Sequence, residues 1–508
     1  MGIKETIDRA KAERVIYEYR YKKNPESVAR LINKLFVGQK IVIFPDTKHS
    51  FDVSTLIDEE LVKFEIVGRD KIVDVEKSSY VILIGYWNKQ GLNDFCSEFA
   101  FPIENIFLPY AHESIVCESK NIDNEIDSLE FGCSKKPELV VVIYHEARDF
   151  ITQSAFEISK YFRLTKIYLQ DMGSSSENIY FDQVIALKGD IKALEYFFYK
   201  HYKFIDICSV FAHGHDFWKC AYIKTLISKE TKLITLSCDW NGAYEDRDVL
   251  VEASGYTLID TYEDEKLALE ISDAVVSNMH SKVLEASGKF LSSYAFMNYN
   301  KFQYIEKSTL NFTSCYAGSV MLANFDTHYG RPQDIRKIFY ELIRYGISLD
   351  IYGNYNININ ESFFDANCHA GSINVRGTLE HEKLPDALKN YDFGIAVYNL
   401  DKDTGQSILD IFGDIIQAKI ITYLSAGIPV VINRELRKTS ELLEKFNCGL
   451  AIDSSEIKNI GKIICQADYL ALKKGVKAFQ DAYKTENPAL KLANFLLDIY
   501  NNSKNVNL

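Results

Sequence analysis

The segment KIITYLSAGIPVVI, residues 419–432, constrains the fold of this chain more than any other stretch. Lys419 to Ala426 has the pattern of the last turns of a helix, and Gly427 supplies the left-handed residue that commonly ends one. Pro429 prevents the helix from continuing. The run Val430 to Ile432 then has the composition of a short buried strand. The segment therefore predicts an αβ unit of a parallel sheet, with one lysine inside the helix.

Apolar runs of strand length alternate with amphipathic segments along most of the chain, which predicts an α/β protein. A length of 508 residues is too great for one hydrophobic core and predicts about three domains. The expected strands form three series: 40–44, 64–68, 80–86 and 105–110; then 138–144, 166–170, 205–216, 232–237 and the start of 272–289; then 312–320, 347–353, 372–377, 393–398 and 429–432. The polar stretch 118–136 is the best linker candidate.

The first series predicts a small Rossmann-type domain that has lost its nucleotide fingerprint. The turn after its first strand, Pro45 to Ser50, contains no glycine. A pyrophosphate needs glycines there so that backbone amides can approach it. Asp70 follows the second strand, where a ribose-binding acid would lie, but without a phosphate loop we interpret it as a surface residue. We therefore expect no dinucleotide cofactor in this domain.

Composition excludes several classes of protein. No run reaches the roughly 18 apolar residues that a membrane helix needs, and the first residues lack the apolar core of a signal peptide, so we expect a cytoplasmic protein. The ten cysteines form no CxxC pair, which argues against a zinc site or a disulfide framework. A net charge of −13 argues against a nucleic-acid partner.

The order of residue types in 419–432 resembles the donor-site segment of the GT-B glycosyltransferases, especially the large retaining family 4, in which the pattern K-x-x-E-Y-L-A-x-G-x-P-V-V recurs. Lys419 is the lysine of that pattern, Tyr423 begins its Tyr-Leu pair, and Thr422 stands at the glutamate position. The stretch GTLEHEKLPDALKNYDFGIAVY, residues 377–398, also matches the family. The resemblance implies a GT-B architecture of two Rossmann-like domains facing a cleft, with the additional Rossmann-like domain before them.

The implied division of the chain follows from the same resemblance. It gives a degenerate Rossmann-like accessory domain with N-terminal helices at 1–117, a linker at 118–136, an acceptor domain at 137–297, a nucleotide-sugar donor domain at 298–480, and a C-terminal helix at 481–508 that crosses back to the acceptor domain.

In such a site, fixed cations and a helix N-terminus neutralise the leaving diphosphate, so no metal cofactor is required. The resemblance places the diphosphate beside Lys419, at the start of a helix beginning near Gly413 and Asp414. Arg331 and Lys337 have the Arg-x5-Lys spacing of the family's cationic pair, although a loop separates them here from the preceding strand.

The other donor-binding candidates follow strands of the same domain. Arg376 and Gly377 correspond to the family's border of the nucleotide base, and Gly318 follows the first strand. Retaining members carry Glu-x7-Glu, whose carboxylates hold sugar and ribose hydroxyls, whereas this chain has Asp414 and Thr422 at those positions. This departure leaves open a changed ribose contact, an unusual donor or lost activity.

The catalytic candidates of the acceptor domain lie in loops after strands. His213 and His215, in HGHD, resemble the H-x-H loop in which a histidine meets the transferred sugar, and Asp239 is expected on the acceptor side. The Asp-x-Asp pairs at 246–248 and 401–403 are interpreted as chance occurrences in an acidic chain.

These features predict a glycosyltransferase that moves a sugar from a nucleotide-sugar donor to a glycan, lipid-linked glycan or protein, with retention. Two alternatives remain at this point: a nucleotide-sugar epimerase of the same fold, and a GT-B-like scaffold subunit without catalysis. Peripheral association with a membrane and a protein partner at the N-terminal domain are both compatible with the sequence.

Overall fold

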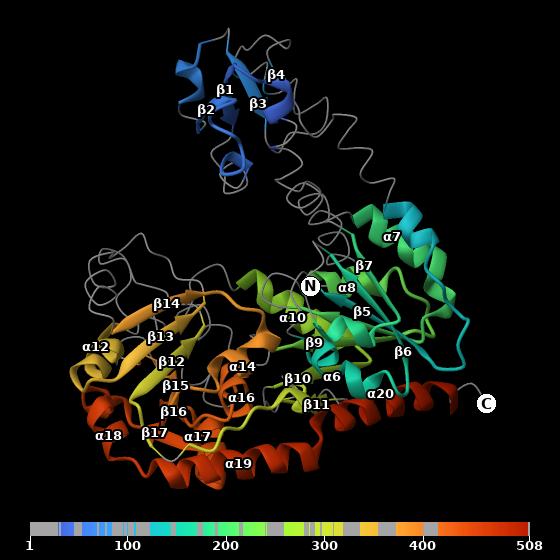
Figure 1. Ribbon diagram of the computed structural model, residues 1–508. Helices are drawn as coiled ribbons and strands as arrows, with labels where there is room; N and C mark the ends of the chain where they lie inside the picture. The colour runs from blue at the N-terminus through green and yellow to red at the C-terminus, as the bar shows by residue number, and fades with distance from the viewer. Residues whose placement is uncertain are drawn as a thin grey trace.

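The structure is a computed structural model that describes residues 29, 32–44, 53–68, 71–76, 79–83, 95, 99, 106–107, 122–143, 149–169, 176–187, 191–212, 217–238, 240, 259–278, 284, 290–294, 297–307, 309–318, 336–353, 372–398, 400 and 415–505. These residues form three parallel sheets (Figure 1). None of the helices in these ranges is long and apolar enough to cross a membrane.

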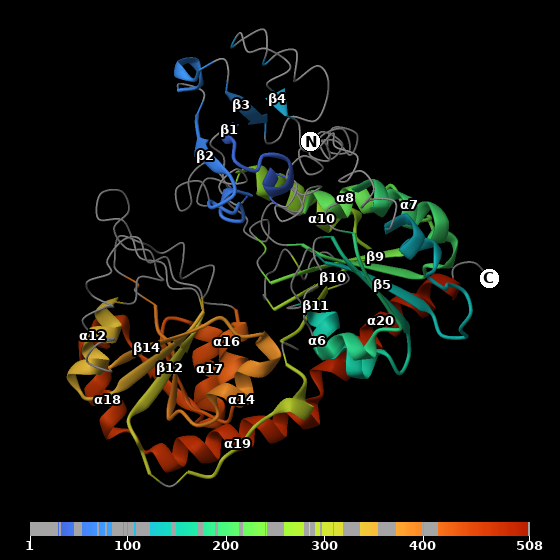
Figure 2. The same ribbon diagram turned by 45° about the horizontal axis from the view of Figure 1, so that its top comes forward.

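The first sheet has four strands in the order β2-β1-β3-β4 and lies apart from the other two in both ribbon views (Figures 1 and 2). Its elements are β1 (Lys40–Phe44), β2 (Lys63–Ile66), η1 (Ile72–Asp74), β3 (Tyr80–Leu83) and β4 (Ile106–Phe107). The four predicted strands are therefore present, and β1 has the predicted bounds. The expected turn at 45–50 and Asp70 lie outside the described residues.

The second sheet has seven parallel strands in the order β11-β10-β9-β8-β5-β6-β7. Its strands are β5 (Glu138–Ile143), β6 (Arg163–Tyr168), β7 (Gln183–Ala186), β8 (Ile207–Phe211), β9 (Lys232–Ser237), β10 (Ala274–Ser277) and β11 (Phe290–Ser292). The connecting elements are α6 (Phe150–Ile158), η4 (Ser176–Tyr180), α7 (Ile191–His201), η5 (Tyr202–Phe204), α8 (Trp218–Lys224) and α10 (Ile259–Ile271).

The third sheet has six parallel strands in the order β14-β13-β12-β15-β16-β17, the doubly wound Rossmann order. Its strands are β12 (Thr313–Ala317), β13 (Ser348–Tyr352), β14 (Ile373–Gly377), β15 (Phe393–Ala396), β16 (Val430–Asn433) and β17 (Gly449–Ile452). Around them lie η9 (Tyr299–Lys301), α12 (Arg336–Arg344), η11 (His381–Lys383), α14 (Leu384–Leu388), α16 (Ala418–Ser425), α17 (Arg437–Phe446), η12 (Ser454–Asn459), α18 (Ile460–Gln466), α19 (Tyr469–Glu486) and α20 (Pro488–Asn505).

The last two helices join the second and third sheets. Asn487 adopts a left-handed conformation that ends α19, and α20 then packs against α6 of the second sheet (Figure 1). Apolar residues of both sheets form one continuous core cluster that includes Phe150, Tyr423 and Leu496. The predicted α/β fold with two Rossmann-like halves is confirmed.

The segment that the polar composition marks as a linker contains a short helical stretch. Residues 122–127 are helical, and Ile122 and Ile126 are buried in the core of the second sheet. Tyr196 in α7 donates a hydrogen bond to Asp127 at 2.8 Å. The polar residues of this segment therefore form the exposed face of a packed helix, which composition without periodicity does not distinguish from a linker.

A repeated hydrogen-bond motif holds the amino-terminal edges of the second and third sheets. In each instance an aspartate directly precedes a strand, and its carboxylate accepts the backbone N–H of a residue on the neighbouring strand. The pairs are Asp182 with Leu164 (2.8 Å), Asp206 with Glu138 (2.9 Å), Asp273 with Leu233 (3.0 Å) and Asp392 with Thr313 (2.9 Å). The aspartate's own N–H donates to the carbonyl of that same residue, at 2.8–3.1 Å. Each aspartate thus fixes the register of two neighbouring strands.

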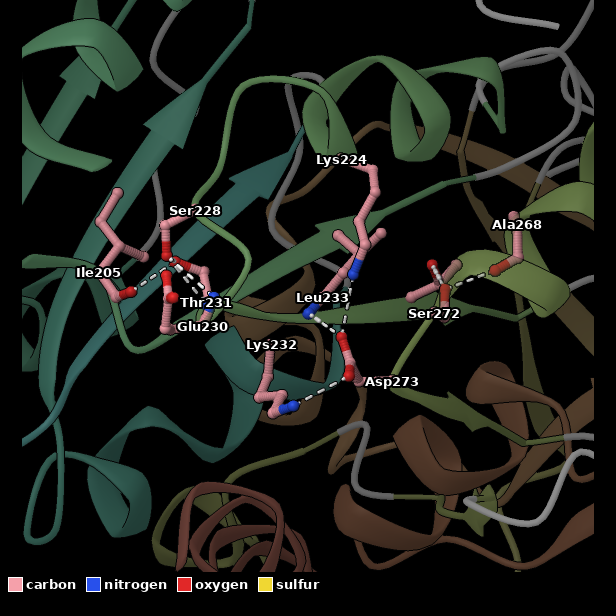
Figure 3. A network of polar contacts seen from close by, with 11 residues as sticks. Ile205, Lys224, Ser228, Glu230, Thr231, Lys232, Leu233, Ala268, Ser272 and Asp273 are labelled. Atoms are coloured by element: carbon pink, nitrogen blue, oxygen red, sulfur yellow. Dashed lines mark hydrogen bonds and ion pairs between the residues drawn. The ribbon is translucent and has the colours of Figure 1, made fainter. Parts of the chain in front are cut away.

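Two of these aspartates also neutralise lysines. Asp273 contacts Lys224 and Lys232 as well as the Leu233 N–H (Figure 3). Burial raises the pKa of Asp273, but the Leu233 N–H and the two lysines lower it more, so that its pKa lies below the ordinary value. Asp392 is fully buried, pairs with Lys307 and accepts from the backbone of Asn311.

We expect Asp392→Ala to lower the free energy of unfolding by about 3 to 5 kcal/mol, because removing one partner leaves a largely buried lysine charge uncompensated. The matched control is Asp386→Ala in the same segment, whose side chain is 69% exposed beside Lys389. It should cost less than about 0.5 kcal/mol. Urea denaturation of both variants measures the difference, and equal losses would contradict the role given to Asp392.

Candidate functional site

The strand order of the third sheet places its switch point between β12 and β15. In open parallel sheets, ligands bind outside the carboxyl ends of the strands at such a point. The residues that leave the sheet there are Gly318 after β12, Gly353 after β13 and Gly377 at the end of β14. The described part of the site therefore begins with glycines at this one edge.

These glycines lie backbone against backbone. The Gly318 N–H donates to the Tyr352 carbonyl, and the Gly353 N–H donates to the Gly377 carbonyl, both at 2.9 Å. A Cβ at Gly353 would lie 2.2 Å from the Gly318 carbonyl oxygen, and the φ of Gly353 is +150°. Only glycine fits this close approach of the two backbones.

Tyr423 joins the two strands that flank the switch point. Its hydroxyl accepts the Ala317 N–H at 2.7 Å and donates to the Ile395 carbonyl at 3.0 Å. The ring fills space above Gly394, where a Cβ would lie 2.3 Å from a ring atom. Burial raises the pKa of the Tyr423 hydroxyl well above its ordinary value, so it remains a neutral hydrogen-bonding group. The tyrosine of the 419–432 segment is therefore structural.

Lys419 lies at the same edge. Its ammonium nitrogen is 4.9 Å from the ring centroids of both Tyr316 and Tyr398, and 3.5 Å from the Tyr316 hydroxyl oxygen. A Cβ at Gly318 would lie 3.3 Å from this nitrogen. The structure thus brings Lys419 and Gly318 together, as expected for one site.

The helix that carries Lys419 begins later than predicted. Residues Ile415 to Gln417 are not helical, α16 begins at Ala418, and Lys419 is therefore in its first turn. Gln417 is the N-cap residue, but its side chain makes no capping bond and instead accepts from the Tyr398 hydroxyl at 2.8 Å. The first amides of α16 consequently lie beside the lysine without a side-chain cap.

The segment before α16 is held from both halves of the molecule. Asn278, at the end of β10 in the second sheet, donates to the Ile416 carbonyl at 3.2 Å. Thr439 in α17 donates to the Ile415 carbonyl at 3.1 Å. The first turn of α16 therefore keeps a fixed position relative to both sheets.

Thr422 is buried and already bonded within the protein. Its hydroxyl donates to the Ala418 carbonyl at 3.0 Å and lies 3.1 Å from Nε2 of His381. Because the hydroxyl proton is used on Ala418, the oxygen accepts from Nε2–H of the histidine. His381, at the start of η11, therefore contacts Thr422, the residue that stands at the glutamate position of the pattern.

Arg376 is the extra residue of a bulge between β13 and β14, since Ile351 pairs with Val375 and Tyr352 with Gly377. Its Nε donates to Asp350 at 2.7 Å, while its side chain remains 52% exposed. Arg376 therefore borders the site but has a protein partner. Lys337 lies in the first turn of α12, and its side chain is not described.

The remaining candidates, His213, His215, Asp239, Arg331 and Asp414, lie outside the described residues, as do the two Asp-x-Asp pairs. Within the part of the chain that is described, no group of three or more His, Cys, Asp and Glu residues could hold a metal ion. Sequence reasoning missed Tyr316, Tyr398 and Asn278, because each follows an ordinary strand pattern and only the topology brings it to this edge.

A buried lysine of the second sheet interacts electrostatically with a carboxylate beside the third sheet. Lys166 in β6 is fully buried; its ammonium donates to Asn178 at 3.1 Å and lies 4.8 Å from the Tyr168 ring centroid. Burial lowers the pKa of Lys166 to about 8, against the opposing effect of the carboxylates of Asp149, Glu382 and Glu177. Glu382 belongs to η11, so this charge lies where the two halves meet.

The family model described as glucosyltransferase 3-like, C-terminal domain, matches residues 330–488, which is less than half of the chain. No curated protein sequence matches.

Among solved structures, the chain is similar to Medicago truncatula UGT71G1 complexed with UDP-glucose, at 11% identity and a TM-score of 0.42, covering 72% of this chain and 99% of that one. It is similar to WaaG, a glycosyltransferase involved in lipopolysaccharide biosynthesis, at 10% identity and a TM-score of 0.42, covering 70% and 98%. It is also similar to the pneumococcal O-GlcNAc transferase GtfA in complex with UDP and GlcNAc, at 11% identity and a TM-score of 0.42, covering 60% of each chain.

The fold is defined by the two strand orders and by helix α20, which follows the third sheet and packs against α6 of the second. Together these define the GT-B class of architecture.

We expect Lys166 to make a contribution to stability that increases with pH between about 8 and 10.5. In that window the unfolded chain holds more protons on this lysine than the folded chain does, since its folded pKa is lowered from 10.5 to about 8. In Lys166→Met this contribution should be absent, and the slope of unfolding free energy against pH should fall. Lys160→Met, at a side chain that is 58% exposed, is the control and should not lower the slope. Urea unfolding at intervals of pH measures both; identical slopes for wild type and Lys166→Met would contradict the expectation.

Proposed function

We propose that this protein is a glycosyltransferase that takes a sugar from a nucleotide-sugar donor and transfers it with retention to a glycan, lipid-linked glycan or protein. The match to a glucosyltransferase 3-like domain at 330–488 supports this proposal. UDP-glucose is the first donor to test, because the similar UGT71G1 structure holds that compound.

The observation that carries the proposal is the position of the Lys419 ammonium at the switch-point edge of the third sheet. It lies beside Gly318, where a small residue leaves room, and in the first turn of a helix whose N-cap side chain is turned elsewhere. A fixed cation and helix amides at one place are the groups that stabilise a diphosphate anion. This arrangement suits the donor half of a transferase.

The chain's own residues then have defined tasks in transfer. The bond between the sugar anomeric carbon and the diphosphate oxygen breaks, and a bond from that carbon to an acceptor hydroxyl oxygen forms. Lys419 and the first amides of α16 stabilise the negative charge that grows on the leaving diphosphate. The acceptor hydroxyl loses its proton to the leaving phosphate on the same face of the sugar, while the protein supplies orientation.

The full-length protein should be stabilised against heat by UDP-glucose or by UDP-N-acetylglucosamine, since a ligand that binds only the folded state raises apparent stability.

Lys419→Ala should reduce kcat/KM for donor roughly ten- to over a hundredfold, because a charge-assisted hydrogen bond contributes about 1.5 to 3 kcal/mol. Lys445→Ala is the control, since this lysine also stacks on a ring, that of Phe446, but lies in α17.

The same assays separate the alternatives. Isomerised nucleotide sugar formed without an acceptor would identify an epimerase, and no thermal shift with any nucleotide sugar would favour a scaffold subunit. A fully active Lys419→Ala protein would refute the assignment of the donor site.

The proposal requires no metal cofactor, because the cation and amides named above neutralise the diphosphate. Chelation with EDTA should therefore leave turnover nearly intact. Activity that is lost with EDTA and restored by manganese would point instead to the Asp-x-Asp pair at 246–248 or at 401–403.

A further inference from the structure

Two tyrosines enclose the ammonium of Lys419. Tyr316 belongs to β12, and Tyr398 is the second residue after the end of β15, so the two rings come from the two strands that flank the switch point. Both residues are buried, with exposures of 1% and 6%, and each ring centroid lies 4.9 Å from the lysine nitrogen. Distances below about 6 Å to a ring centroid give attraction between a cation and the ring.

The rings are themselves fixed. The Tyr398 hydroxyl donates to Gln417 at 2.8 Å, and its backbone N–H donates to the Asn433 side chain at 2.6 Å. Tyr316 packs edge to face against Phe339 of α12, with ring centroids 6.0 Å apart. Since neither ring can turn away without breaking these contacts, they define where the ammonium lies.

This way of holding a lysine differs from an ion pair in one respect that matters for anion binding. A carboxylate would cancel the positive charge, whereas a ring attracts it through its quadrupole and leaves the net charge unchanged. Among the described residues, no carboxylate lies within ion-pair distance of Lys419. Burial raises the pKa of Tyr316, against the opposing effect of Lys419, so its hydroxyl stays protonated at neutral pH and adds no negative charge.

We propose that Tyr316 and Tyr398 are positioning residues that hold the Lys419 ammonium in place, without neutralising it, for the diphosphate of the nucleotide-sugar donor. This inference rests on the proposed function, because it assigns the two rings to the same donor site. The affinity for the diphosphate then depends on the electron-rich faces of two aromatic side chains.

The test compares UDP with uridine on the full-length protein, by calorimetry for UDP and by saturation-transfer NMR for uridine. Tyr316→Leu and Tyr398→Leu should each weaken UDP binding about 3- to 30-fold, the range expected for a partly desolvated cation–ring contact, and leave uridine binding unchanged. Tyr316→Phe and Tyr398→Phe keep the ring and should stay within about threefold of wild type. Tyr340→Leu is the matched control, since Tyr340 stacks on Arg344 of α12 outside the site.

Because the leucine variants leave space in a packed region, a second series keeps the volume nearly constant. Phenylalanines with one, two and three ring fluorines at position 398 reduce the negative face of the ring stepwise, and UDP affinity should fall in the same order. A flat series, or leucine variants with wild-type UDP affinity, would overturn the inference. Equal losses for UDP and uridine would also overturn it, because the rings would then support packing of the whole pocket. If wild type binds neither UDP nor any nucleotide sugar, the proposed function fails first and the inference with it.

Discussion

The structure depends on the aspartates that precede strands and bind the backbone of the neighbouring strand. Register errors in a parallel sheet move every side chain to the wrong face, so a fixed starting residue determines the whole strand. Asp392 and Asp273 show how strongly the amino-terminal edges are held, since each also neutralises lysines. With the register fixed at that edge, the opposite edge can consist of glycine loops and a lysine that contribute little to stability.

Much of this architecture is legible in the sequence, and the exceptions have physical reasons. The central strands are continuous apolar runs because both faces are buried, and these were predicted. The strands β7, β11 and β17 were not predicted; they lie at or next to sheet edges, have three or four residues each and are only partly buried. The structural role of Asp392 cannot be recognised from the local sequence, because its hydrogen-bond partners lie about eighty positions away.

The candidate site was predictable in its centre and not in its surroundings. The helix, Gly427 and the strand at 430–433 follow local rules, and Lys419 lies in that pattern. Of the two rings beside Lys419, Tyr316 lies 103 residues earlier in the chain, in β12, and Tyr398 follows β15. Such long-range contacts are set by sheet order, which no local pattern encodes.

The crossing of α20 to the second sheet has a consequence for the order in which the protein can complete its folding during synthesis. Leu492 and Leu496 of α20 belong to the same core cluster as Phe150 and Ile158 of α6. The strands of the second sheet leave the ribosome long before residues 488–505 do, and domains generally fold as they emerge. Until that helix arrives, the apolar surface of α6 lacks its cover. The half of the molecule made earlier therefore acquires its complete core only after the third sheet has been synthesised.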